Sequence, residues 1–226
     1  MSSVLDCVEI EPHAPAQGTV IWLHGLGASG HDFEPIVPAL GLPQIRFVFP
    51  HAPAAPVTIN GGYVMPSWYD IRSLDLSSDR ESAQDIRRSA LKIEALIARE
   101  NDRGIPTERI VVAGFSQGGA MALHVGLRYP VALCGIVSLS AYLVLPSTLS
   151  DEAHAANFTT PVLICHGVQD PTVPFQAGQH ARDLVRGLSA TRDISWHEFP
   201  MQHEVCPAEV SVISEWLQAR FAAFNA

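Results

Sequence analysis

The sequence has few cysteines, few charged residues and no long apolar run, and each shortage excludes a class of protein. No stretch approaches the roughly 20 apolar residues of a transmembrane helix, and the first nine residues lack the pattern of a signal peptide. The cysteines show neither zinc-ligand spacing nor a dense disulfide framework. They are Cys7, Cys134, Cys165 and Cys206. We therefore expect a cytoplasmic protein with reduced cysteines and no integral membrane association.

Charge is scarce and mostly negative. Only 16% of the residues are charged, and the formal net charge is −9. No cluster of Lys or Arg offsets this balance, so nucleic acid is not an expected partner. Hydrophobic residues make up 47% of the 226 residues, which is typical of a compact globular chain. Since no repeat or linker interrupts the sequence, we expect one domain over residues 1–226.

Short β-branched apolar runs alternate with segments of helical periodicity. The runs expected as strands are Thr19–Leu23, Ile45–Phe49, Ile110–Gly114, Leu133–Leu139, Pro161–Cys165 and Ile194–Phe199. The expected helices start at the Ser78–Glu81 capping box, at Gln117, at Phe175 and near Pro207. Continuous apolar runs are typical of strands buried on both faces. The alternation predicts an α/β fold with a mostly parallel central sheet flanked by helices. The long irregular stretch His51–Leu76 is expected to be functional or lid-like.

A candidate nucleophile stands between an expected strand and an expected helix. The residues Gly-Phe-Ser-Gln-Gly at 114–118 have the strand–turn–helix context that a Gly-x-Ser-x-Gly nucleophile requires. The two glycines remove side chains that would clash with so tight a turn. The turn places Ser116 at a helix N-terminus, where unpaired N–H groups favour developing negative charge. We predict Ser116 as the nucleophile and the N–H of Gln117 as the first oxyanion donor.

A serine hydroxyl needs a base and a carboxylate that orients this base. In this arrangement the chain order is Ser, then Asp or Glu, then His. Asp170 follows an expected strand and precedes a proline, although Asp-Pro is also an ordinary turn signature. Of the later histidines, His180 falls in a helix and His197 in a strand, whereas His203 follows a strand. We therefore predict Asp170 and His203 as the other members of a catalytic triad.

The first long apolar run leads into His24-Gly25-Leu26-Gly27. Glycines in such a turn let the backbone come close to a substrate, so the N–H of Leu26 is the expected second oxyanion donor. His24 precedes Ser116 in the chain, which is the wrong order for the base. We expect His24 to hold the turn by hydrogen bonding.

These segments together resemble a known family, the small carboxylesterases related to lysophospholipases and acyl-protein thioesterases. The absence of a signal peptide is similar to their bacterial branch. The matching segments are Leu23–Gly27 with Asp32-Phe33, Phe49–Pro53, Ser67–Asp70, Gly114–Gly119, His166–Pro174 and Met201–His203. The resemblance implies an α/β-hydrolase fold with a minimal lid, no metal and no cofactor, and it implies the same triad and oxyanion donors. Members often form dimers, so a homodimer stays open. Many relatives have Gly where this chain has Gln202, whose side chain would narrow the site or shift its loop.

We expect a carboxylesterase that hydrolyses short- to medium-chain esters of small molecules or lipids through an acyl-enzyme on Ser116. The residues expected to line an apolar acyl pocket, each of which fits core packing equally well, are Leu26, Met65, Trp68, Leu74 and Leu76. One methylene provides only ~1–3 kcal/mol of discrimination, so broad chain-length tolerance is expected. An acyl-protein thioesterase or lysophospholipase is the main alternative. A perhydrolase, a peptidase and a non-catalytic binding protein on the same fold are the others, and the Ser–Asp–His order disfavours the last.

Overall fold

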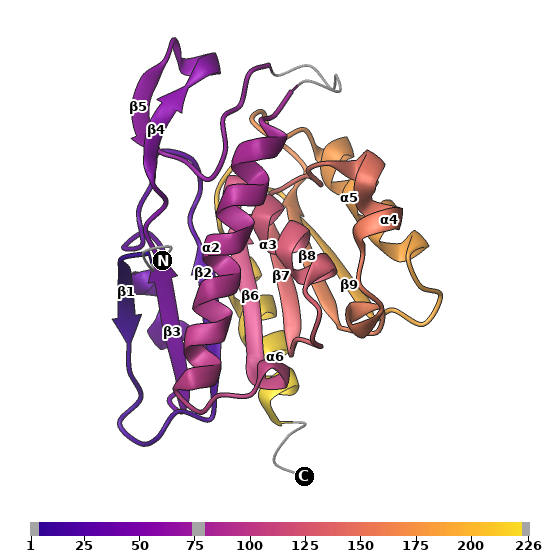
Figure 1. The fold of residues 1–226 in the computed structure, drawn as a ribbon. Coiled ribbons are helices and arrows are strands. Elements are labelled where there is room, and N and C mark those ends of the chain that lie inside the picture. Colours follow the sequence, from indigo (N-terminus) through magenta and orange to yellow (C-terminus); the bar gives the residue numbers. More distant parts are fainter. Residues whose placement is uncertain (1–4, 74–79, 223–226) are drawn as a thin grey trace.

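A seven-stranded sheet forms the centre of the computed structural model, which describes residues 5–73 and 80–222 (Figure 1). Across the sheet the strands are β1 (Cys7–Ile10), β3 (Ile45–Pro50), β2 (Gly18–Leu23), β6 (Ile110–Phe115), β7 (Gly135–Leu139), β8 (Val162–Gly167) and β9 (Ile194–Phe199). Only β1 is antiparallel to its neighbour β3, and the other neighbouring pairs are parallel. The predicted mostly parallel sheet is therefore confirmed.

The buried strands follow from the sequence, and the edge strand β1 does not. Every residue of β2, β3, β7 and β8 is buried, because helices cover both faces of the sheet. Strand β1 escaped prediction because it has only four residues, all half-buried, and so lacks a continuous apolar signal. Its antiparallel pairing with β3 places it at one edge of the sheet.

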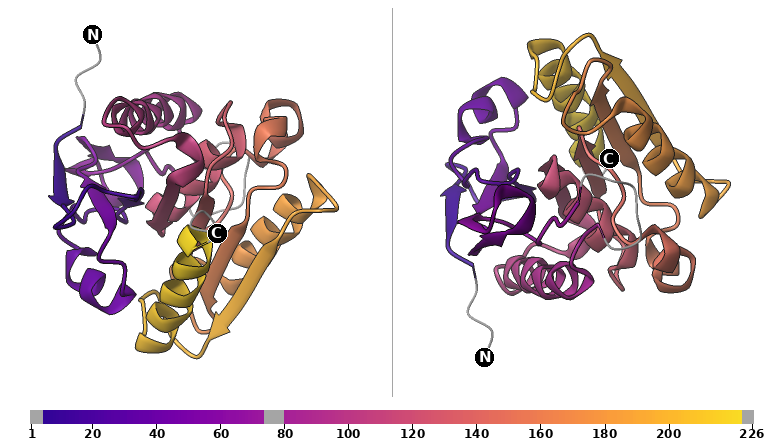
Figure 2. Two further views of the ribbon diagram at one scale, coloured as in Figure 1. Left: turned by 90° about the horizontal axis from the view of Figure 1, so that it is seen from below. Right: turned by 90° about the horizontal axis from the view of Figure 1, so that it is seen from above.

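Helices form a layer on each face of the sheet (Figure 2). One hydrophobic core lies under the helices α2 (Ala83–Asp102), α3 (Gln117–Arg128) and α5 (Phe175–Gly187), together with the short α4 (Leu149–Glu152). The other core lies under α6 (Pro207–Ala222) and the short α1 (Val37–Leu40). No helix within the described residues is both long and apolar enough to cross a membrane.

Helix α2 begins later than the sequence predicts. Ser82 is its N-cap, with a side-chain oxygen that accepts a hydrogen bond from the N–H of Asp85 at 3.3 Å. Glu81 instead forms an isolated antiparallel bridge with Ile71. Ser78 and Asp79 of the predicted capping box lie outside the described residues, and the helix begins after Glu81, with the cap formed by Ser82 and Asp85.

The stretch His51–Leu76 contains a hairpin where the sequence suggests only irregular structure. Strands β4 (Ala54–Val57) and β5 (Tyr63–Pro66) pair antiparallel and project beyond the sheet, as Figure 1 shows. Asp70 ties the turn to the following segment, since its two carboxylate oxygens accept hydrogen bonds from the N–H and the hydroxyl of Thr58, both at 2.7 Å. After the hairpin, the chain returns to the carboxyl end of β6 (Ile110–Phe115), where the candidate nucleophile lies.

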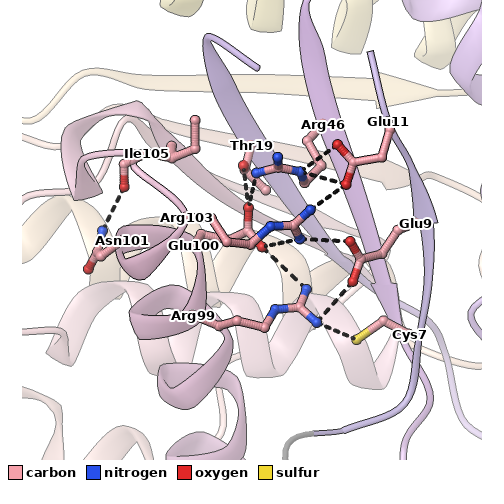
Figure 3. Close-up of polar contacts among 10 residues, drawn as sticks. All are labelled: Cys7, Glu9, Glu11, Thr19, Arg46, Arg99, Glu100, Asn101, Arg103 and Ile105. Carbon is pink, nitrogen blue, oxygen red and sulfur yellow. Dashed lines mark hydrogen bonds and ion pairs between the residues drawn. The ribbon is translucent and has the colours of Figure 1, made fainter. Parts of the chain in front are cut away.

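At the amino ends of β2 and β3, a buried carboxylate organises an ion-pair network (Figure 3). Glu100 on α2 is completely buried and accepts hydrogen bonds from Arg46 at 2.7 Å and from the hydroxyl of Thr19 at 2.9 Å. Arg103 contacts the same carboxylate at 3.1 Å and reaches Glu9 on β1 at 2.7 Å. The network therefore joins the end of α2 to three strands, far from the carboxyl ends of the strands.

Candidate active site

The nucleophile turn has the strained geometry that its motif predicts. Ser116, between β6 and α3, has φ 54° and ψ −119°, a conformation that costs a residue with a Cβ roughly 1–3 kcal/mol. A Cβ on Gly114 would lie 2.3 Å from the backbone of Gly118, and one on Gly118 would lie 2.2 Å from the carbonyl oxygen of Leu23. Both glycines are therefore required by close backbone approach.

The structure brings the three predicted triad residues together at the carboxyl ends of the parallel strands. The Nε2 atom of His203, in the loop after β9, lies 2.9 Å from the Oγ of Ser116. Its Nδ1 atom lies 2.7 Å from the Oδ2 of Asp170, in the loop after β8. We assign the proton to Nδ1, so that the imidazole donates to Asp170 and accepts the hydroxyl proton of Ser116.

Local packing fixes the base and the carboxylate. The Oδ1 of Asp170 accepts hydrogen bonds from the backbone N–H groups of Thr172 and Val173, both at 2.8 Å. The ring of Phe115 packs against the imidazole of His203, with the centroids 4.8 Å apart. A Cβ on Gly167 would lie 2.4 Å from the carbonyl oxygens of residues 201 and 202, so this glycine lets the histidine loop rest on the end of β8.

Gln202 does not narrow the site as its side chain would suggest. The residue is exposed and is not among the residues that line the catalytic cleft. Its backbone carbonyl lies over Gly167, while its side chain faces solvent. The side chain of Gln202 is therefore accommodated outside the cleft.

Two further histidines support the site without contacting the serine. Nδ1 of His24 lies 2.7 Å from the carbonyl oxygen of Gly25, and its Nε2 accepts the N–H of Ala52 at 3.0 Å. The predicted role of His24 in holding the turn is confirmed. The Nε2 of His166 lies 2.9 Å from the carbonyl oxygen of Val173. Burial lowers the pKa of both His24 and His166, which favours the neutral rings.

The two predicted oxyanion donors have unused N–H groups. Within the described part of the chain, neither the N–H of Leu26 nor that of Gln117 donates to a protein acceptor. Both residues line the same cleft as Ser116. Gln117 is the first residue of α3, where the helix dipole adds partial positive charge. The arrangement can accept negative charge on an oxygen beside Ser116.

The cleft around Ser116 has a volume of about 330 Å³ and mostly apolar walls. Leu26, Ile59 and Ile71 are among its apolar lining residues, and Tyr69 and Tyr142 also line it, with their hydroxyls 2.9 Å apart. A neighbouring cavity of about 670 Å³ shares three lining residues with the cleft. They are Arg80, Tyr142 and Thr172. The two cavities therefore adjoin.

Of the residues expected to line the acyl pocket, Leu26 lines the cleft, whereas Trp68 does not. Trp68 is 1% exposed and belongs to the core, where its indole N–H donates to the carbonyl oxygen of His24 at 2.9 Å. Met65 stands outside the lining and faces Gly27, within 3.5 Å of a Cβ built there. Leu74 and Leu76 lie outside the described residues.

Several lining residues escaped prediction. Ile59 lies between the hairpin strands, and Ile71 and Tyr142 come from separate loops. Their pattern in the sequence is that of ordinary core residues, so no local signal separates a cleft wall from the core. The Ser67–Asp70 segment was recognisable by resemblance, but its residue Tyr69, and not Trp68, faces the cleft.

A mostly parallel sheet with a strained serine between strand and helix, and histidine and aspartate on later loops, defines an α/β-hydrolase. The chain belongs to the Phospholipase/Carboxylesterase family, whose model matches residues 5–221. It is a carboxylic ester hydrolase of that family. No group of His, Cys, Asp or Glu in the described residues has the arrangement of a metal site.

The relatives include fungal and plant acyl-protein thioesterases. The chain is 38% identical over 218 residues to acyl-protein thioesterase 1 of Gibberella zeae, covering 92% of both chains. It is 36% identical over 216 residues to the Yarrowia lipolytica protein of the same name, covering 93% of this chain and 95% of the relative. The crystal structure of Zea mays acyl-protein thioesterase 2 matches with 29% identity and a TM-score of 0.84, covering 96% and 99% of the chains. These relatives support the family and not the bacterial branch that the sequence suggested.

Proposed function

We propose that this protein is a serine thioesterase that hydrolyses acyl groups from protein thioesters through an acyl-enzyme on Ser116. The observation that carries the proposal is the chain of contacts from Ser116 to His203 to Asp170, at 2.9 and 2.7 Å, beside two unused N–H groups. Such a chain activates a hydroxyl for attack on an acyl carbon. The name of the fungal relatives, acyl-protein thioesterase 1, supports protein thioesters as the substrate class.

In the proposed acylation step, the Oγ of Ser116 forms a bond to the carbonyl carbon while Nε2 of His203 takes the hydroxyl proton. The carbonyl oxygen becomes an oxyanion, which accepts hydrogen bonds from the N–H groups of Leu26 and Gln117. Such a donor contributes about 3–4 kcal/mol in comparable sites. The C–S or C–O bond then breaks, and His203 gives its proton to the leaving sulfur or oxygen.

In the proposed deacylation step, His203 takes a proton from water, and the resulting hydroxide attacks the acyl-enzyme carbonyl. A second oxyanion forms at the same two donors and collapses with release of the acid and of Ser116, which regains its proton from His203. Asp170 holds the imidazole in the tautomer that both steps need and stabilises the imidazolium between them.

The sizes of the cavities bear on the acyl chain length that we propose. The cleft of about 330 Å³ alone fits short to medium chains, which favours a general carboxylesterase as the second candidate function. The adjoining cavity of about 670 Å³ offers room for a longer chain. We favour the longer chain because this larger cavity adjoins the cleft that holds Ser116.

A series of peptides S-acylated on one cysteine, from butyryl to palmitoyl, separates the two candidates because the leaving group stays constant. We expect kcat/KM to be maintained or to rise toward palmitoyl, and Ser116→Ala to abolish hydrolysis. Ser211→Ala, which removes an exposed hydroxyl on α6, is the matched control and should keep full activity. A peak at short chains would favour the carboxylesterase, and equal rates for wild type and Ser116→Ala would contradict both.

A further inference from the structure

The two proposed oxyanion donors come from distant parts of the chain, and a third segment joins them. Leu26 lies in the turn after β2, and Gln117 begins α3 after β6. Residues Pro66–Tyr69, which run from the last residue of the hairpin, lie between these two places and bond to both of them. We call these four residues the bridging segment.

The first set of bonds ties the bridging segment to the turn that carries Leu26. The N–H of Gly27 donates to the carbonyl oxygen of Pro66 at 2.8 Å. The indole N–H of Trp68 donates to the carbonyl oxygen of His24 at 2.9 Å. Hydrogen bonds therefore hold the chain on both sides of Leu26, at His24 before it and at Gly27 after it.

The second set ties the same segment to the side chain of Gln117. Its Oε1 accepts the backbone N–H of Trp68 at 2.8 Å, and its Nε2 donates to the carbonyl oxygen of Tyr69 at 2.7 Å. Gln117 is 2% exposed and Trp68 is 1% exposed, so these bonds form away from water. Hydrogen bonds in such surroundings are electrostatically stronger than in water, and they rigidify the groups that they join.

The proposed reaction does not require the side chain of Gln117. The proposed oxyanion donor is its backbone N–H, which any residue except proline would supply. A buried amide at the start of α3 nevertheless uses both its donor and its acceptor on one segment. That segment, through Trp68, reaches the other donor turn. A side chain needed only to fill space would not require this pairing.

We propose that the side chains of Gln117 and Trp68 are positioning residues, which hold the two oxyanion donors at a fixed separation before substrate arrives. The inference rests on the proposed function, because it assigns a purpose to the donors named there. Since the donors act on charge that develops in the transition state, loosening them should slow the chemical steps and leave ground-state binding nearly unchanged.

The test uses Trp68→Phe, which removes the indole donor together with part of the buried ring, and Gln117→Glu, which keeps the acceptor and puts a carboxyl oxygen in place of the donor to Tyr69. With p-nitrophenyl butyrate as substrate, we expect kcat to fall at least about tenfold. The fall should be smaller than the roughly 10²–10³-fold loss seen when an oxyanion donor is removed completely. KM should stay within about twofold of the wild-type value. A trifluoromethyl ketone that forms a tetrahedral adduct on Ser116 should lose affinity by the same factor as kcat/KM. The double variant should lower kcat by less than the product of the two single factors, because both substitutions loosen the same bridging segment.

Ser214→Ala is the matched control. It removes a buried hydrogen bond of 2.9 Å to the carbonyl oxygen of Leu40, away from the site. We expect it to lower the unfolding temperature without changing kcat or inhibitor affinity. If Trp68→Phe and Gln117→Glu behave like this control, the inference is overturned while the proposed function stands. If the wild-type protein itself neither hydrolyses the ester nor binds the ketone, the proposed function fails instead. Should Trp68→Phe not fold, Gln117→Glu alone decides between these results.

Discussion

A buried carboxyl group under the histidine loop should make the stability of the protein depend on pH. Glu209, on the first turn of α6, is 0% exposed, and neither carboxyl oxygen has a side-chain hydrogen-bond partner among the described residues. Burial raises the pKa of Glu209 from 4.5 to about 8 in the folded protein. Between about pH 4.5 and pH 8, the carboxyl group of Glu209 is therefore mostly protonated in the folded protein and mostly ionised in the unfolded protein.

The sign and size follow from this difference in pKa. Because the folded pKa is raised above the unfolded value, the group disfavours folding increasingly as the pH rises from about 4.5 to about 8. At 1.36 kcal/mol per pH unit, the cost reaches about 3 kcal/mol at pH 7. Glu209→Gln removes this dependence, whatever constant effect the amide has on packing.

Urea unfolding of wild type and Glu209→Gln at pH 5, 6, 7 and 8 measures the effect. We expect the wild-type free energy of unfolding to fall relative to the variant by about 2–3 kcal/mol between pH 5 and pH 7. Parallel pH dependences for the two proteins would refute the reasoning. They would mean that Glu209 is solvated or paired in a way that the buried position does not indicate.

Three further predictions concern other parts of the fold. Glu100→Gln should cost about 1–3 kcal/mol of unfolding free energy, because Arg46 loses its buried carboxylate and keeps only its pair with Glu11, while kcat/KM measured on the same preparation stays unchanged. Asp170→Asn should lower kcat about 10⁴-fold through the wrong imidazole tautomer, with an unfolding temperature near that of wild type by calorimetry. Gly118→Ala should destabilise the protein by about 1–3 kcal/mol or more in urea unfolding, since its Cβ would meet the Leu23 carbonyl at 2.2 Å; an unchanged midpoint would contradict the close approach.

The sequence predicts the chemical centre of the site better than its walls. Ser116, Asp170 and His203 are recognisable because each follows a strand. These strands are parallel, so the loops after them meet at the carboxyl ends of the strands. The strands themselves are recognisable because burial on both faces leaves continuous apolar runs. These signals are local, and parallel topology converts them into proximity.

The walls depend on tertiary packing that no local pattern records. For Trp68 the sequence leaves the acyl pocket and core packing equally open, and in the structure its indole N–H donates to a buried carbonyl and the ring belongs to the core. Ile59 reaches the cleft only because the hairpin β4–β5 turns back toward the sheet. Likewise, Ser82 caps α2 although Ser78–Glu81 has the same type of signature, and Glu81 forms a bridge with Ile71 instead.

The central claim is that Ser116 carries the acyl group during turnover. Rapid quenching of the protein with an S-palmitoyl peptide, followed by intact-mass and peptide mass spectrometry, tests this claim directly. The account predicts a covalent palmitoyl adduct on the peptide that contains Ser116, which accumulates in Asp170→Asn if deacylation becomes slower than acylation and is absent in Ser116→Ala. Turnover of the thioester by Ser116→Ala at the wild-type rate, or an acyl adduct on another residue that forms and decays at the rate of turnover, would contradict it.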